Sequence, residues 1–143
     1  MEVPSAKEKV AYWYFRLNGF FQIENLIVHP VRRGGQRTDA DVLAVRFPHR
    51  AERLFDDPND IMADDEERLA LSRDRIDVVL EEVKTNQPCT LNGPWTRQDR
   101  QNVHRVLAAV GCLPADQIEE AAADIYRLGS RQQAWAPRPP GRG

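Results

Sequence analysis

One short segment, residues 76–86 with the sequence IDVVLEEVKTN, constrains the fold of this chain more than any other. It begins apolar at consecutive positions and rich in β-branched residues, which is typical of a strand covered on both faces of an α/β sheet. It ends in charge. Because side chains alternate along a strand, Glu82 and Lys84 are expected to leave the sheet on the same face. This pair fits either a solvated ion pair or a metal-binding carboxylate beside a lysine that handles a phosphate or a water.

Two more strands are predicted before this segment. Residues 20–29 and 41–47 are rich in apolar and β-branched residues, and a proline follows each run. The second run carries acid at its start, where Asp39 and Asp41 fall on one face. The start of this strand and the end of the 76–86 segment are therefore the two places where charge meets a buried sheet.

Helices are predicted on both sides of these strands. Residues 5–17 begin with a capping pair, Ser5 and Glu8, and continue with apolar residues at helical spacing, so that the stripe Val10, Trp13, Tyr14 and Leu17 is expected to face the core. Residues 97–110 and 114–128 show the same periodicity, and each is followed by glycine. The expected order is helix, strand, strand, strand, helix, helix.

Composition predicts a single α/β domain over residues 1–129. With 143 residues, 41% of them hydrophobic and 29% charged, the chain is long enough for one substantial core. Residues 48–75 contain many acidic residues and are expected to form a surface insertion between strands. Residues 130–143 are rich in proline and arginine, and form an expected flexible tail.

The same composition bears on location and partners. No apolar stretch approaches the length of a membrane span, and no export signal opens the chain, so a cytoplasmic protein without a membrane partner is expected. The two cysteines, Cys89 and Cys112, are too few for a disulfide framework and are expected to be reduced thiols. A formal net charge of −2 neither favours nor excludes nucleic acid.

The acid and the Glu-x-Lys tripeptide meet if the second and third strands pair. In an antiparallel pair the start of one strand lies beside the end of the next, which brings Asp41, Glu82 and Lys84 to one edge of the sheet. The turn between the first two strands adds Arg32, Arg33 and Arg37, which form either a solvated loop or a phosphate contact.

With Asp41 and the tripeptide Glu82-Val83-Lys84 placed on these strands, residues 5–110 resemble the PD-(D/E)xK phosphodiesterase superfamily. The resemblance implies a restriction-endonuclease-like core, with a central mixed sheet of three or four strands flanked by helices. Glu24 would supply the further acid that some members use, and Gln98 or Gln87 the polar residue that others place after the lysine. Alanine replaces the family's proline at position 40, and no convincing fourth strand follows residue 110.

The resemblance also implies a reaction. Asp41, Glu82 and the carbonyl of Val83 would bind Mg²⁺ or Mn²⁺, and Lys84 would position or deprotonate a water or stabilise developing charge. The expected function is a metal-dependent nuclease acting on nucleic acid, with DNA favoured over RNA, and homodimers are compatible with the family.

Two alternatives stay open. A domain of the same fold without catalysis would bind nucleic acid or a protein partner. An unrelated small α/β protein would use Glu82 and Lys84 only to solvate the end of a strand. The histidines are scattered without zinc-site spacing, and no phosphate-binding glycine loop or nucleophile elbow is present.

Overall fold

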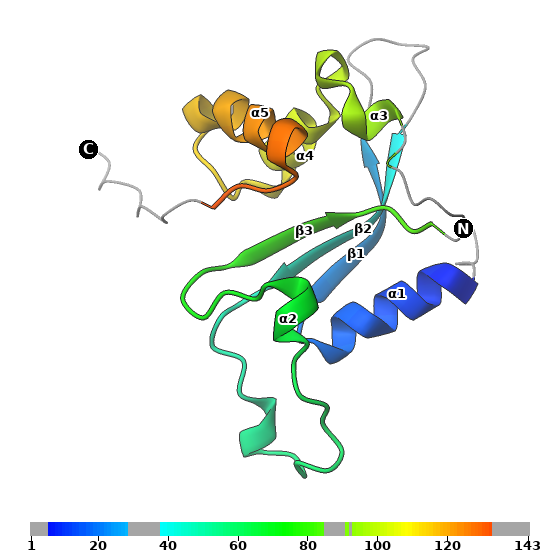
Figure 1. Ribbon diagram of the computed structural model, residues 1–143, viewed down its shortest axis with the longest axis vertical. Coiled ribbons are helices and arrows are strands. Elements are labelled where there is room, and N and C mark those ends of the chain that lie inside the picture. Colours follow the sequence, from blue (N-terminus) through cyan, green and yellow to red (C-terminus); the bar gives the residue numbers. More distant parts are fainter. Residues whose placement is uncertain (1–5, 29–37, 85–90, 92, 133–143) are drawn as a thin grey trace.

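A three-stranded antiparallel sheet separates one long helix from a pair of helices (Figure 1). The computed structural model describes residues 6–28, 38–84, 91 and 93–132. The sheet has the order β1–β2–β3, and its principal elements are α1 (Ala6–Leu17), β1 (Phe21–Val28), β2 (Thr38–Arg46), β3 (Asp77–Glu81), α4 (Asn102–Val110) and α5 (Ile118–Leu128). The predicted α/β class is confirmed. The expected mixed sheet is wrong for the described residues, because both strand pairs are antiparallel.

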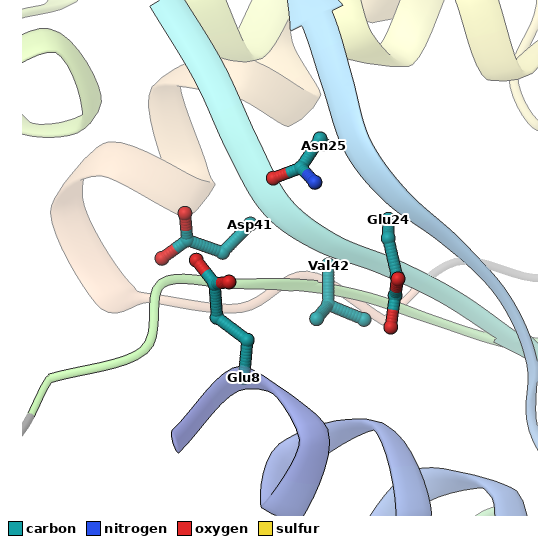
Figure 2. Close-up of a pocket in the computed structure, with 5 residues that line it drawn as sticks. All are labelled: Glu8, Glu24, Asn25, Asp41 and Val42. Atoms are coloured by element: carbon teal, nitrogen blue, oxygen red, sulfur yellow. The ribbon is translucent and has the colours of Figure 1, made fainter. Parts of the chain in front are cut away.

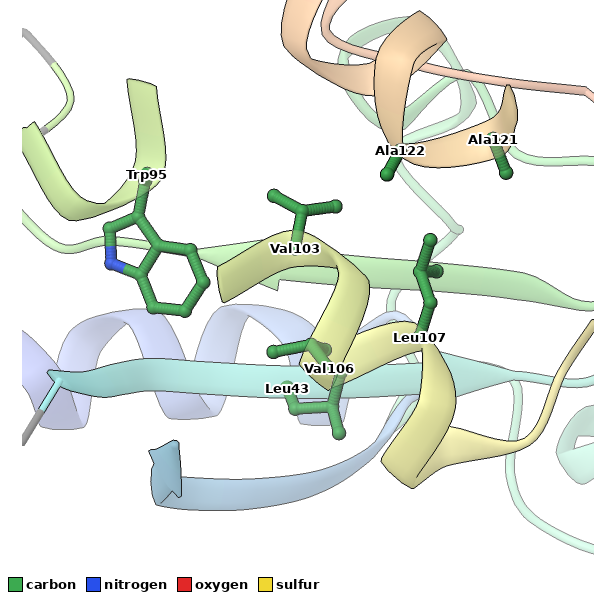
Figure 3. Packing of buried hydrophobic residues seen from close by; sticks show 7 residues of the cluster. All are labelled: Leu43, Trp95, Val103, Val106, Leu107, Ala121 and Ala122. Atoms are coloured by element: carbon green, nitrogen blue, oxygen red, sulfur yellow. The ribbon is translucent and has the colours of Figure 1, made fainter. Parts of the chain in front are cut away.

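The central strand β2 supplies both cores because its side chains alternate between the two faces. Val42 and Ala44 pack with Phe15 and Phe20 in what we term the α1 core. Leu43 faces the other way into the α4/α5 core, which also holds Trp95 of the short helix α3 (Gly93–Thr96) and residues of α4 and α5 (Figure 3). All three β2 residues are at most 5% exposed. β2 is therefore covered on both faces. The prediction of such a strand at residues 76–86 is wrong, because no residue of β3 is fully buried and Val78 is 36% exposed.

The face that α1 turns toward the sheet differs from the predicted one. Val10, Trp13 and Leu17 are 71%, 57% and 43% exposed, whereas Phe15 is 4% exposed. The chain reverses at Gly19, whose φ is +87°, and Phe20 follows at once with its ring 5.2 Å from that of Phe15. The tight reversal fixes which side of an otherwise apolar helix meets the sheet.

The predicted helix over residues 97–110 is divided. A short 3-10 turn, η2 (Gln98–Arg100), ends at Gln101, which has a left-handed φ of 57°, and α4 begins only at Asn102. The predicted helix over residues 114–128 is largely confirmed as α5, preceded by the turn η3 (Ala115–Gln117). Gly111 and Gly129 end α4 and α5 in left-handed conformations, as their positions in the sequence predict.

The acidic segment after β2 forms an extended arm, residues 48–65, followed by the short helix α2 (Glu66–Leu69) (Figure 1). Arg46 is 6% exposed and donates to the carbonyl of Asn18 at 3.0 Å and to Asp64 at 2.8 Å. Arg50 binds both Asp64 and Glu52, so the two ends of the arm are joined at its base. Two acidic residues of this segment, Asp64 and Glu52, therefore pair with arginines of the same domain.

Within the described ranges, none of the helices combines the length and the apolar character needed to cross a membrane.

Candidate functional site

The pairing of β2 with β3 brings the predicted acid and the predicted tripeptide to one end of the sheet. The two strands are antiparallel, with Leu43 opposite Leu80 and Val42 opposite Glu81. Continuing this register by one residue places Asp41 beside residue 82. The strand pairing that the sequence argument assumed is thus confirmed.

A hydrogen bond fixes Asp41 against the tripeptide. The backbone N–H of Val83 donates to Oδ2 of Asp41 at 2.7 Å. The bond links residues 42 positions apart in the chain. One oxygen of Asp41 is therefore oriented by the backbone of the Glu-x-Lys segment.

Glu82 and Lys84 lie side by side, as alternation along an extended chain predicts. Nζ of Lys84 is 3.3 Å from Oε1 of Glu82, and the two side chains are 29% and 9% exposed, respectively. A nearly buried carboxylate is costly to desolvate unless it is paired, and the ammonium provides that pairing. The pair is therefore more than a solvated strand end.

The tripeptide lies just beyond the strand on which the sequence placed it. β3 ends at Glu81, so residues 82–84 continue the chain without a strand partner. The expectation that Glu82 and Lys84 lie within the strand is wrong, although their shared side is preserved.

A shallow hollow beside Asp41 gathers further acid (Figure 2). It is lined by Glu8 of α1, Glu24 and Asn25 of β1, and Asp41 and Val42 of β2. In Figure 2 the carboxylate of Glu8 points from the helix toward that of Asp41. The predicted auxiliary residue Glu24 is thus in the same hollow as Asp41, and Glu8 is an acid that the sequence argument used only as a helix cap.

Asn25 interrupts β1 at this hollow. Its φ is 52°, a left-handed value that asparagine adopts more readily than most residues. The register is the same on both sides of it, with Glu24 opposite Val42 and Leu26 opposite Ala40, so Asn25 falls opposite Asp41 without an inserted residue. The irregular backbone therefore coincides with the acidic hollow.

Glu81 is a second acid that the sequence argument left without a role. Burial raises its pKa, and the nearby charge of Asp41 raises the pKa further. Its Oε2 is buried and accepts no hydrogen bond from any described residue. The signal for it in the sequence was the pair of acids Glu81-Glu82 directly after the apolar run Val78-Val79-Leu80.

Replacing Glu81 with glutamine is expected to stabilise the protein at neutral pH. Because the pKa of Glu81 is raised, the folded protein binds more protons than the unfolded chain between the ordinary pKa of 4.5 and the raised value. Stability therefore falls as pH rises through this window, and the penalty is complete above it. Thermal melts should show Tm of Glu81→Gln higher by about 2–4 °C at pH 7, a modest shift because the group is only partly buried. The difference should disappear below pH 4.5, and a lower Tm for the variant at pH 7 would contradict the assignment.

The remaining predicted residues are not brought to this hollow. Gln98 lies in the exposed turn η2 and is not among the residues that line the hollow. Arg32, Arg33 and Arg37, with Gln87, lie outside the described residues.

The residue types at this end of the sheet suit a hard divalent cation, but the side chains lie too far apart to hold one as they stand. Asp41, Glu82, Glu8 and Glu24 supply carboxylates, which Mg²⁺ and Mn²⁺ prefer, and Glu81 has an oxygen without a described partner. In the described part of the chain, however, no three histidine, cysteine or acidic side chains are close enough together to hold a metal ion. A cation would therefore have to draw these side chains inward.

Comparison with known proteins gives no match for this chain among protein-family models, curated proteins or solved structures. The resemblance to the PD-(D/E)xK superfamily stays a prediction from the motif and its placement.

Proposed function

We propose that this protein is a metal-dependent nuclease that hydrolyses phosphodiester bonds in nucleic acid, DNA or RNA. The observation that carries the proposal is the meeting of Asp41 with the Glu82-Val83-Lys84 segment, through the β2–β3 register and the hydrogen bond from Val83 to Asp41. The hydrogen bond joins residues 42 positions apart in the chain, and the nearly buried Glu82 is paired with Lys84 at the same end of the sheet.

Each group has a defined part in the proposed reaction. Asp41 and Glu82, with the carbonyl of Val83, would hold Mg²⁺ or Mn²⁺, and Glu8 and Glu24 would add negative charge at the hollow's rim. When bound, the cation supplies charge neutralisation at the phosphate and activation of a water. Lys84, already 3.3 Å from Glu82, would stabilise the charge that develops on the phosphate oxygens or hold the attacking water.

Removal of the ammonium at position 84 tests the proposal. Lys84→Ala is expected to lower the rate of cleavage of supercoiled plasmid in Mg²⁺ or Mn²⁺ by about 100-fold, the scale of losing one electrostatic stabiliser of a transition state. Arg68→Ala is the matched control, because it removes a cation that is 82% exposed. Its activity should equal that of the wild type.

Three outcomes separate the candidate functions. Cleavage that needs the divalent cation and Lys84 supports a nuclease. Absence of cleavage, combined with Mn²⁺-dependent NMR broadening at Asp41 and Glu82, identifies a module of the same fold that binds without catalysis. Absence of both effects leaves a structural ion pair.

A further inference from the structure

An apolar region remains uncovered on the sheet face that packs against α4 and α5. The α4/α5 core covers Leu43 of β2 and, in part, Leu80 of β3. Two residues along the sheet, the register forms the row Phe21–Val45–Val78 across the three strands. Phe21 is 71% exposed and Val78 is 36% exposed, and Phe47 and Ile23 beside them are 51% and 55% exposed. We term Phe21, Ile23, Phe47 and Val78 the sheet patch.

The sheet patch is ordered rather than a scatter of single apolar residues. The rings of Phe21 and Phe47 meet edge to face, with centroids 6.0 Å apart. Phe21 is opposite Val45 in the register, and Phe47 follows two residues later, directly after β2. A contiguous exposed apolar patch is more often an interaction site than are single apolar residues scattered over a surface.

The arm that follows β2 leaves the sheet at this same end (Figure 1) and carries exposed apolar side chains of its own. Leu54 and Phe55 near its tip are 78% and 91% exposed, although both are large hydrophobic residues. The arm's base is held by Arg50 and Arg46 through Asp64, so its position is set before any partner arrives. Presenting an apolar tip on a braced arm lowers the entropy lost on binding.

Charge makes the two surfaces complementary. The tip carries the exposed acids Asp56, Asp57 and Asp60. Arg73 and Arg75 lie directly before β3, at the end of the sheet that holds the patch, with side chains 88% and 43% exposed. Their ion pairs within the chain are long and solvent-exposed, with Glu66 at 3.7 Å and Asp74 at 3.9 Å, so both cations are accessible to a partner's acids. An acidic apolar tip therefore matches an apolar patch edged by arginine.

We propose that the protein forms a two-fold symmetric dimer in which the arm tip of each copy binds the sheet patch of the other. In a two-fold dimer the contact between tip and patch occurs twice, because each copy supplies one tip and one patch. Both surfaces lie at one end of this protein. Leu54 and Phe55 would bury against Phe21 and Phe47, with the tip acids beside the arginines. The inference does not depend on nuclease activity.

Sedimentation velocity of the full chain between about 1 and 200 µM tests this arrangement. Dimers are expected at the upper concentrations. Phe55→Ser and Phe21→Ser should each raise the dimer dissociation constant at least about tenfold, as truncation of an aromatic anchor does. Trp13→Ser is the control, because it removes an aromatic side chain that is 57% exposed on α1, which packs on the opposite face of the sheet. It should leave the dissociation constant unchanged.

A mixing experiment distinguishes this dimer from any other. A copy with Phe55→Ser keeps an intact patch, and a copy with Phe21→Ser keeps an intact tip, so a mixed dimer retains one complete contact. An equimolar mixture should therefore dimerise more strongly than either variant alone. Circular dichroism and Tm should match the wild type for both variants. A protein that stays monomeric at every concentration, a dimer that responds to only one of the two substitutions, or a mixture no stronger than its components would overturn the proposal.

Discussion

Replacing Arg46 with methionine is expected to lower the free energy of unfolding by about 3 kcal/mol, because it breaks a buried ion pair from one side. The guanidinium is 6% exposed and binds two partners, the carbonyl of Asn18 at 3.0 Å and the carboxylate of Asp64 at 2.8 Å. Methionine fills most of the volume but donates to neither. Both acceptors then lose a charged donor in a place that water reaches poorly.

The loss should spread along the arm, because Asp64 is shared with Arg50 at the arm's base. Urea unfolding should show a lower midpoint, and limited proteolysis should cut within residues 48–65 faster than in the wild type. Arg73→Met is the matched control, since that side chain is 88% exposed and its ion pair with Glu66 spans 3.7 Å. The control should change stability by less than about 0.5 kcal/mol. Equal effects of the two substitutions would mean that Arg46 does not hold the arm.

A second hydrogen-bond cluster supports the same junction. The hydroxyl of Tyr14 donates to Asp65 at 2.6 Å, and the side-chain oxygen of Asn18 accepts from the N–H of Asp65 at 2.7 Å. The shared bond holds the pKa of Asp65 below its usual range and raises that of Tyr14. The acidic segment that sequence alone marked as a surface insertion is therefore joined to α1 and β2 at its base, while its tip remains exposed.

Periodicity and turn residues were sufficient to predict the strands, α1 and α5. These features depend on local patterns, such as the apolar run before Glu81 and the glycines after α4 and α5. The sequence argument assumed that β2 and β3 pair as antiparallel neighbours, and the meeting of Asp41 with the tripeptide followed from that assumption.

The features that sequence did not predict depend on contacts between distant residues. The face of α1 that is buried was set by the reversal at Gly19 and by Phe20, not by the helix's own spacing. The left-handed turn at Gln101 divides a segment whose periodicity is continuous. Glu8 enters the hollow only because α1 lies across β2, and no pattern within α1 distinguishes that acid from an ordinary first-turn glutamate.

The doublet Glu81-Glu82 offers the sharpest test of which carboxylate serves the proposed reaction. Glu82→Gln is expected to lower the rate of DNA cleavage in Mg²⁺ or Mn²⁺ by about 1,000-fold, because it removes a proposed metal ligand and the partner of Lys84 together. Glutamine keeps the shape of the side chain, so the fold should persist. Mn²⁺-dependent NMR broadening at Asp41 should weaken in the same variant.

Glu81→Gln is the matched comparison, one residue away. The register places Glu81 opposite Val42, whose side chain enters the α1 core, so Glu81 is on the α1 side of the sheet, whereas Glu82 is beside Lys84. Its cleavage rate should stay within about tenfold of the wild type, the scale expected for a group that acts only through its charge on Asp41. If Glu81→Gln were inactive and Glu82→Gln active, the roles of the two acids would be exchanged. A sharp fall in Tm for Glu82→Gln would instead show that the pairing of Glu82 with Lys84 is structural. An amide at a position needed only for metal binding should leave the core around β2 intact.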